Sequence, residues 1–163
     1  MSRSRLLPPS WPQDDSGFYC LLLHVPRPIY LTAGRLSGTH VEPGFALYVG
    51  RARKNLFARL ARHMRRRKPR RWHIDYFFPA ATPLGAFVLT DGGLSECAIA
   101  DRLARRPAVR RIIPGFGASD CRCKGHLLWM PAGKAPVATG LQKVEFRPPL
   151  HLAGAAFFPA ATW

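Results

Sequence analysis

The sequence predicts a small domain of the α+β class, on three observations. Continuous apolar runs of strand length occur at residues 17–25, 45–50 and 85–90. Amphipathic helical patterns follow the second and the third of these runs. The chain has 163 residues and is 47% hydrophobic, which is enough to bury the core of one domain with tails. We therefore expect strands and helices packed into one domain over residues 17–130.

The N-terminal part supplies the first two strands. Residues 1–16 are rich in Pro, Ser and charge without any period, which is typical of a disordered tail. The run at 17–25 is bounded by glycine and proline and suits a strand buried on both faces. A stretch rich in Pro and Gly, with a short strand inside it, separates this run from the next. The two long strands can pair antiparallel, which would bring Tyr19 close to Tyr48.

A helix is predicted over residues 53–66. Its apolar side chains form one stripe at helical spacing, made of Leu56, Phe57, Leu60 and Met64. The same spacing places four polar side chains on the opposite face, which are Arg59, Arg62, His63 and Arg66.

The second half of the domain continues the alternation of helices and strands. Ile74, Phe77 and Phe78 have the spacing of a short helix, and residues 85–90 form the third strand. A helix over 95–106 turns Ile99 and Leu103 toward the core, and Glu96 lies on the same side. The run "GHLLWM" can add an edge strand. Residues 131–163, rich in Ala, Pro and Gly, are expected to form a loosely attached extension.

The charge of the chain predicts a polyphosphate partner. Twenty-five Lys and Arg against nine Asp and Glu give a net charge of +16 and a pI near 11.2. Nucleic acid is the first expectation and an anionic membrane surface the second. No apolar run approaches the roughly 20 residues of a spanning helix, and the N-terminus lacks the pattern of a signal peptide. We expect a cytoplasmic protein without a membrane partner.

The basic residues concentrate between residues 51 and 71. This segment holds 11 Lys or Arg in 21 residues and no acid before Asp75. A solvated helix face is the plain interpretation, but the absence of compensating acids favours a surface that follows a phosphate backbone. The candidate nucleic-acid-binding residues are Arg51, Arg53, Arg62, Arg66 and Arg70.

An ordered set of motifs resembles the GIY-YIG nuclease superfamily over residues 17–130. It consists of Gly17-Phe18-Tyr19, then Tyr48-Val49-Gly50, then Arg59 and His63 on one helix, then Glu96 on a later helix. The runs "HIDY", "SEC" and "PGFGASDCRCKGHL" are similar to an uncharacterised prokaryotic branch of that superfamily, which carries a Gly-Phe-Gly-x-Ser-Asp-Cys-x-Cys motif.

The resemblance implies a central three-stranded antiparallel sheet flanked by helices, and metal-dependent hydrolysis of phosphodiester bonds. It implies that Tyr19 and Tyr48 are the catalytic tyrosines, that Arg59 binds the phosphate with His63 as its partner, and that Glu96 holds Mg²⁺ or Mn²⁺. Charge that develops on a phosphate in the transition state needs such cations. One carboxylate is sufficient, because Mg²⁺ keeps most of its waters. Either tyrosine could act as the base if its pKa is lowered by a metal and an arginine.

The sequence also departs from the superfamily. Asn55 is the only asparagine, so the downstream asparagine of many relatives is missing, and Arg51 stands where a small residue is common. Ser119 or Asp120 could substitute for the asparagine, because both are polar and lie in the family-like loop, and His73 is a further auxiliary candidate.

A group of thiols and one imidazole has ligand types that Zn²⁺ accepts. Its members are Cys97, Cys121, Cys123 and His126. The Cys-x-Cys spacing is atypical beside the usual Cys-x₂₋₄-Cys, and a buried structural turn is the alternative.

Three functions are consistent with these observations. The first is a Mg²⁺-dependent endonuclease, a hydrolase that cuts DNA, structured or single-stranded, with RNA not excluded. The second is a non-catalytic DNA- or RNA-binding module on the same fold, and the third is a basic RNA-associated protein. The intact set of Tyr19, Tyr48, Arg59 and Glu96 favours the enzyme.

Overall fold

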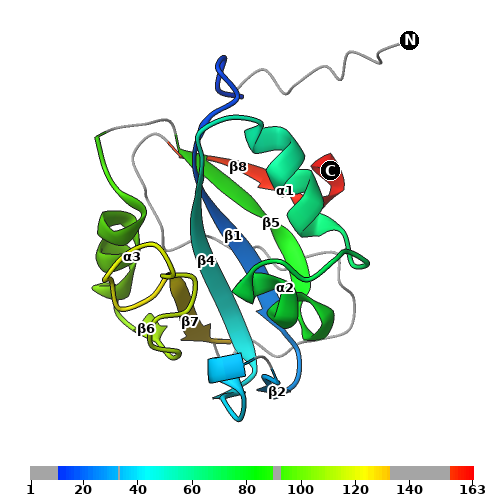
Figure 1. Ribbon diagram of the computed structural model, residues 1–163, viewed down its shortest axis with the longest axis vertical. Helices are drawn as coiled ribbons and strands as arrows, with labels where there is room; N and C mark the ends of the chain where they lie inside the picture. Colours follow the sequence, from blue (N-terminus) through cyan, green and yellow to red (C-terminus); the bar gives the residue numbers. More distant parts are fainter. Residues whose placement is uncertain (1–10, 33, 90–92, 133–154) are drawn as a thin grey trace.

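A computed structural model describes residues 11–32, 34–89, 93–132 and 155–163. These residues form a six-stranded antiparallel sheet with the strand order β6-β7-β4-β1-β5-β8, crossed by helices (Figure 1). Its strands are β1 (Gly17–Val25), β4 (Gly44–Ala52), β5 (Thr82–Leu89), β6 (Arg110–Arg111), β7 (Leu127–Pro131) and β8 (Ala155–Pro159). A separate two-stranded sheet pairs β2 (Ile29–Tyr30) with β3 (His40–Val41). The helices are α1 (Leu56–Met64), α2 (His73–Phe77) and α3 (Glu96–Ala104).

The three predicted strands are the centre of this sheet. β1 pairs antiparallel with β4 on one side, as the apolar runs predicted, and with β5 on the other. The sheet itself is larger than the predicted three-stranded one, because β7 and β6 extend it beyond β4 and β8 extends it beyond β5. β8 comes from the segment that we expected to be loosely attached. Its Phe158 is buried in the core, which explains why this apolar segment joins the sheet.

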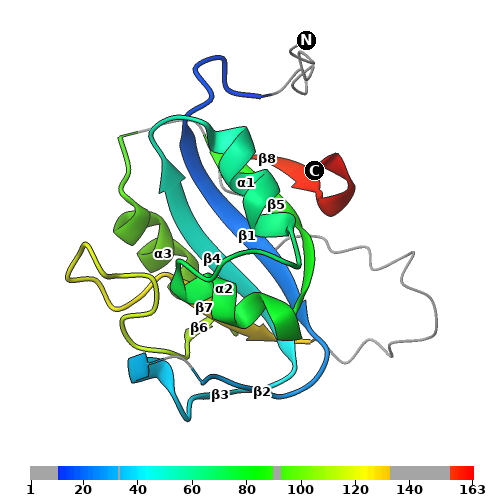
Figure 2. The same ribbon diagram turned by 45° about the vertical axis from the view of Figure 1, so that its right-hand side comes forward.

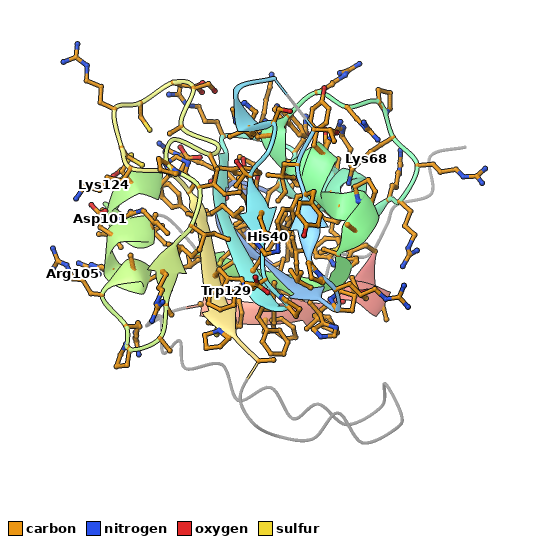
Figure 3. The ribbon with its side chains drawn as sticks, turned by 90° about the horizontal axis from the view of Figure 1, so that it is seen from below. His40, Lys68, Asp101, Arg105, Lys124 and Trp129 are labelled. Atoms are coloured by element: carbon orange, nitrogen blue, oxygen red, sulfur yellow. The ribbon has the colours of Figure 1, made fainter. Side chains whose placement is uncertain are left out.

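The sheet separates two apolar cores. Alternate residues of β1 point to opposite faces, so Tyr19, Leu21 and Leu23 pack in the core beneath α1 and α2. Cys20 and Leu22 pack on the other face in the core that α3 closes. Figure 2 shows α1 and α2 in front of the strands and α3 behind them. The view from below separates Asp101 and Arg105 of α3 from Lys68, which follows α1, across the sheet (Figure 3).

The packed structure begins before β1. Trp11 is buried against Phe57, Phe158 and Trp163, with ring centroids 5.0–5.6 Å apart. Asp15 then caps α1, because its carboxylate accepts a hydrogen bond from the N–H of Phe57 at 2.9 Å. The last six residues of the predicted tail therefore belong to the fold, and residues 1–10 lie outside the described part of the chain.

All three predicted helices form, with one important difference in α1. Leu56 and Leu60 are buried as predicted, but His63 is buried as well, at 1% exposure, and does not lie on the polar face. His63 follows Leu60 by three residues and Leu56 by seven, so it lies on the same stripe. Among the described residues, no helix is long and apolar enough to cross a membrane.

Candidate active site

The phenol of Tyr19 packs directly over a glycine of the neighbouring strand. Tyr19 of β1 is opposite Gly50 of β4 in the antiparallel register. A Cβ atom at Gly50 would collide with the ring and the hydroxyl of Tyr19. Glycine is therefore required at the end of Tyr48-Val49-Gly50 so that the Tyr19 side chain can lie flat across the strand.

Tyr48 lies on the same face and is held by a second glycine. Its ring contacts Gly117, where an added Cβ would lie 2.8 Å from Cε2, and φ is +72°. The N–H of Gly117 donates to Nδ1 of His73 at 3.2 Å, which attaches this loop to α2. His73 is thus linked to the loop that contacts Tyr48, and its auxiliary role stays a prediction. Phe116 lies beneath Tyr48 with ring centroids 6.1 Å apart.

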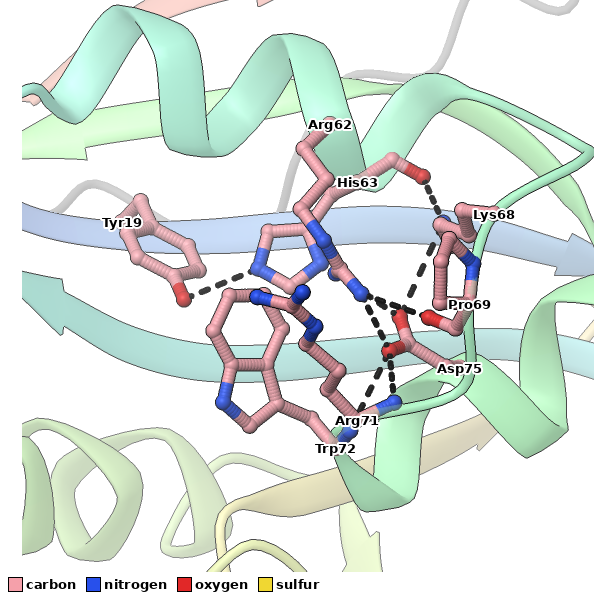
Figure 4. Close-up of polar contacts among 8 residues, drawn as sticks. All are labelled: Tyr19, Arg62, His63, Lys68, Pro69, Arg71, Trp72 and Asp75. Atoms are coloured by element: carbon pink, nitrogen blue, oxygen red, sulfur yellow. Dashed lines mark hydrogen bonds and ion pairs between the residues drawn. The ribbon is translucent and has the colours of Figure 1, made fainter.

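His63 lies between the two tyrosines. Its Nε2 is 3.1 Å from the hydroxyl of Tyr19, and its ring centroid is 5.5 Å from that of Tyr19 and 6.3 Å from that of Tyr48 (Figure 4). Burial, assisted by the nearby charge of Lys68, lowers the pKa of His63 to about 3. The imidazole is therefore neutral at physiological pH and can accept the hydroxyl proton of Tyr19. Its Nδ1 is buried and has no hydrogen-bond partner among the described residues.

The tyrosines do not have the lowered pKa that a simple base requires. Burial raises the pKa of Tyr19 to about 12, and the nearby charge of Arg59 and a hydrogen bond from it only partly oppose this effect. Burial also raises the pKa of Tyr48. Arg59 alone does not offset the effect of burial, so both hydroxyls are protonated at neutral pH. The expected lowering of the pKa by a metal and an arginine together stays a prediction.

Arg59 lies at the open end of this group. Its Nη1 donates to the carbonyl oxygen of Arg51 at 3.1 Å, and its guanidinium lies 5.2 Å from the ring centroid of Trp72. Its positive charge partly opposes the rise in the pKa of Tyr19, so the guanidinium lies within electrostatic reach of that hydroxyl. The contacts with Arg51 and Trp72 hold a planar cation next to the two tyrosines. A shallow pocket of about 400 Å³ opens nearby, at the Gly17 end of β1, lined by Ser16, Gly17, Arg51, Ala52 and Arg53.

Glu96 faces the same group from the first turn of α3. Ser95 caps this helix, since its Oγ accepts a hydrogen bond from the N–H of Ala98 at 3.1 Å. The negative charge of Glu96 raises the pKa of both Tyr19 and Tyr48, so the carboxylate is within electrostatic reach of both hydroxyls. α3 packs on the opposite core, but β7 pairs with β4 only from Gly44 to Tyr48. The end of β4 that carries Gly50 is thus not covered by β7.

A buried aspartate that the sequence analysis did not single out organises the segment between α1 and α2. Asp75 is 2% exposed and accepts hydrogen bonds from both terminal nitrogens of Arg62, at 3.2 and 2.9 Å (Figure 4). It also accepts from the N–H groups of Arg71 at 2.9 Å and Trp72 at 3.1 Å, and Lys68 lies 3.9 Å away. Burial opposes its ionisation, yet the hydrogen bonds from Arg62 and these amides hold its pKa below the ordinary value. In the sequence, the only sign of this role is that Asp75 is the single acidic residue near a long basic segment.

Trp72 is a second residue that the sequence analysis missed. Its ring lies 5.2 Å from the ring of His63 and stacks under the guanidinium of Arg62 at 4.2 Å, besides supporting Arg59. Arg62, predicted to contact nucleic acid, is instead held by Asp75 and Trp72. Of the other predicted contacts, Arg51 is half-buried, and the exposed ones are Arg53, Arg66 and Arg70.

The remaining auxiliary candidates lie apart from this group. Ser119 and Asp120 are exposed, and the Oγ of Ser119 donates to the Oδ1 of Asp120 at 2.6 Å. Among the described residues, neither side chain makes a hydrogen bond or an ion pair with the tyrosines. Their role in place of the missing asparagine stays a prediction.

A separate cluster has the composition of a metal site. The ligand atoms of Cys97, Cys121, Cys123 and His126 all lie within 4.8 Å of one another. Three sulfurs and one imidazole nitrogen are a donor set that can bind a metal ion and is more typical of zinc than of magnesium, which prefers oxygen. The candidate zinc ligands, separated by 24 residues in sequence at their widest gap, are thus brought together by the fold.

Comparison with known proteins gives one result. Residues 18–145 match the sequence model of a family described as "Domain of unknown function DUF123". No curated protein and no solved structure matches the chain.

Proposed function

The chain belongs to the DUF123 family, whose description assigns no activity, and from the site itself we propose that it is a metal-dependent nuclease that hydrolyses phosphodiester bonds of DNA. The proposal rests on one observation above all. Tyr19, Tyr48, Arg59 and His63 converge at one end of the sheet, with the charge of Glu96 within reach of both tyrosines. The resemblance to GIY-YIG nucleases is a prediction that the family match neither supports nor opposes.

The residues around Glu96 fit a hard divalent cation. Glu96 is half-buried and makes no hydrogen bond or ion pair with the described residues, so its oxygens are available as ligands. In the proposal Glu96 holds Mg²⁺ or Mn²⁺, which supplies Lewis-acid stabilisation of charge on the phosphate when bound. Arg59 contributes the second positive charge, and its planar guanidinium suits two phosphate oxygens.

Tyr19 and His63 orient the attacking water in this proposal. Tyr19 donates its hydroxyl proton toward Nε2 of His63, which turns the oxygen lone pairs toward Arg59 and the water. The water loses a proton to Tyr19, and Tyr19 passes its own proton to Nε2. The hydroxide forms the new bond to phosphorus as the bond to the leaving oxygen breaks. The leaving oxygen takes a proton from solvent, and His63 then returns its proton to solvent through Tyr19. Burial is the main cause of the low pKa of His63, and the charges of Lys68, Arg62 and Arg59 lower it further. A phosphate bound at Arg59 would offset only the contribution of these charges, which favours the transfer.

The surface beside the site suits a nucleic-acid backbone. Arg53 precedes α1, and the run from Arg65 to Arg67 follows it, and these side chains are exposed. The net charge of +16 supports the same partner. A module that binds without cutting would use this surface equally well, and it is the alternative that the experiment must separate.

The experiment compares cleavage of supercoiled plasmid DNA, short DNA duplexes and RNA, with Mg²⁺, with Mn²⁺ and with a chelator. Tyr19→Phe is the matched variant, because it keeps the ring over Gly50 and removes only the hydroxyl that bonds His63. We expect cation-dependent DNA cleavage, reduced at least about a hundredfold by Tyr19→Phe, the lower range for loss of acid-base catalysis. Binding without cleavage in every cation would contradict the enzyme and support the binding module.

A further inference from the structure

The cluster of three cysteines and one histidine has the dimensions of a tetrahedral metal site. The Sγ atoms of Cys97 and Cys121 each lie 3.6 Å from Nε2 of His126. Tetrahedral zinc, with bonds of about 2.3 Å to sulfur and about 2.0–2.1 Å to nitrogen, places a sulfur and a nitrogen ligand about 3.6 Å apart. These two separations match those of ligands that share one ion, and all four ligand atoms lie within 4.8 Å of one another.

The surroundings of the cluster also resemble the outer shell of a metal site. The ring of His126, which is 3% exposed, faces the thiols with Nε2, and the backbone of Gly117 lies close enough to oppose the lowering of its pKa by burial. A partner of this kind fixes the ring orientation and leaves the other nitrogen for the metal. The N–H of Gly125 donates to Sγ of Cys123 at 3.3 Å, which stabilises a thiolate.

The charges nearby suit three thiolates. Zn²⁺ with three thiolates and a neutral imidazole carries one net negative charge. Arg111 donates to the carbonyl oxygen of Gly125 at 3.0 Å, and Arg122 and Lys124 line an open pocket with Cys123. Because Arg111 is also paired with Asp101 at 2.6 Å, Arg122 and Lys124 are the nearby cations that can offset the negative charge.

We propose that Cys97, Cys121, Cys123 and His126 bind one structural zinc ion that ties the first turn of α3 to the loop before β7. Four protein ligands leave no open position, so the ion is structural and does not take part in hydrolysis. Cys97 directly follows Glu96, and His126 lies close to the Gly117 that packs on Tyr48. The zinc therefore helps to fix the positions of Glu96 and of the Gly117 loop that packs on Tyr48. Binding of zinc itself does not depend on the nuclease proposal.

The spacing of cysteines along the sequence does not reveal this metal site, because its four ligands come from two separate elements of the fold. The Cys-x-Cys spacing lies outside the usual Cys-x₂₋₄-Cys pattern, and Cys121, Cys123 and His126 come from one loop. The fourth ligand comes from a helix on the other side of a 24-residue separation. The fold, and not a local turn, completes the tetrahedron.

The test measures metal content and zinc affinity of the full chain, purified under reducing conditions and without nucleic acid. We expect one zinc per chain in the wild type, and zinc affinity at least about a hundredfold weaker in Cys121→Ser and Cys123→Ser, since even an outer-shell change costs ten- to a hundredfold. Cys20→Ala is the matched control, because Cys20 is a thiol buried in β1 outside the cluster, and it should keep its zinc. Equal loss of zinc in Cys20→Ala would overturn the assignment.

A second measurement does not depend on the folding of any variant. Co²⁺ titrated into wild-type protein stripped of metal should give the intense visible bands of tetrahedral thiolate coordination at one equivalent, and Zn²⁺ should abolish them. The absence of these bands, or a mass two hydrogens lower that shows a disulfide in the cluster, would overturn the proposal. Either result leaves the nuclease proposal untouched, because cleavage is not measured.

Discussion

Replacing Asp75 by Asn tests how the segment between α1 and α2 is held. The carboxylate pairs with Arg62 and Lys68, whose side chains are 19% and 4% exposed, and accepts two backbone hydrogen bonds. Removing one partner of a buried ion pair costs about 3–5 kcal/mol. Arg62 retains some solvent and the amide oxygen of Asn can still accept a hydrogen bond. We therefore expect the lower end, about 3 kcal/mol, or a Tm lower by about 6–12 °C.

The control is Asp101→Asn, which removes a pair with Arg111 at 2.6 Å where the aspartate is half-exposed. An exposed pair of this kind contributes less than about 1 kcal/mol. Urea unfolding of both variants, followed by circular dichroism, gives the two free energies. If Asp75→Asn costs no more than Asp101→Asn, the network around Asp75 does not stabilise the fold.

The depressed pKa of Asp75 also determines how the stability difference between wild type and Asp75→Asn changes with pH. The folded-state pKa of Asp75 is depressed, so its contribution is fully present above the unfolded value near 3.9 and is lost as the pH falls through the folded value. The difference in stability between wild type and Asp75→Asn should be full at pH 7 and should shrink below about pH 4. A difference that grows on acidification would contradict the depressed pKa.

Three further predictions concern the site and the basic surface. If about six phosphates are neutralised, log K for DNA should fall with log salt at a slope near −5, and a slope near zero in a titration would exclude this surface. Arg59→Lys should lose most cleavage and keep most affinity for DNA, because an ammonium lacks the planar fork of the guanidinium. The exposed Arg67→Lys should change neither cleavage nor affinity. Equal effects at both positions would contradict a special role for Arg59. Gly50→Ala should cost about 1–3 kcal/mol by overpacking Tyr19, and much less in a Tyr19→Ala background; equal costs in both backgrounds, measured by urea unfolding, would show that the two residues do not collide.

The central fold could be predicted because its signals are local. The apolar runs that became β1, β4 and β5 and the stripe of Leu56 and Leu60 can be read within a few residues. β8 could not be predicted in the same way, since it is stabilised by pairing with a strand about 70 residues earlier in the chain. Trp11 was missed for the same reason, because its partners are Phe158 and Trp163 at the far end of the chain.

The candidate site was predicted in its composition and only partly in its chemistry. The residue types and the pairing of β1 with β4 were sufficient to bring Tyr19 and Tyr48 together. Their burial was not visible in the sequence, and burial decides the direction of their pKa. His63 was misplaced because a histidine was assigned to the polar face, although its spacing from Leu60 already placed it on the apolar one. Asp75 and Trp72 act through contacts that only the folded segment creates.

The measurement that tests the nuclease proposal most directly is single-turnover DNA cleavage by Glu96→Gln in Mg²⁺. Glu42→Gln is the matched control, because it makes the same change at an exposed carboxylate just before Gly44, at the other end of β4. Loss of the charge that holds the cation should reduce cleavage by Glu96→Gln at least about a hundredfold, while DNA affinity in chelator stays equal or becomes slightly tighter. Glu42→Gln should cut at the wild-type rate. Cleavage by Glu96→Gln at the wild-type rate would show that Glu96 does not hold the metal and that the proposed active site is wrong.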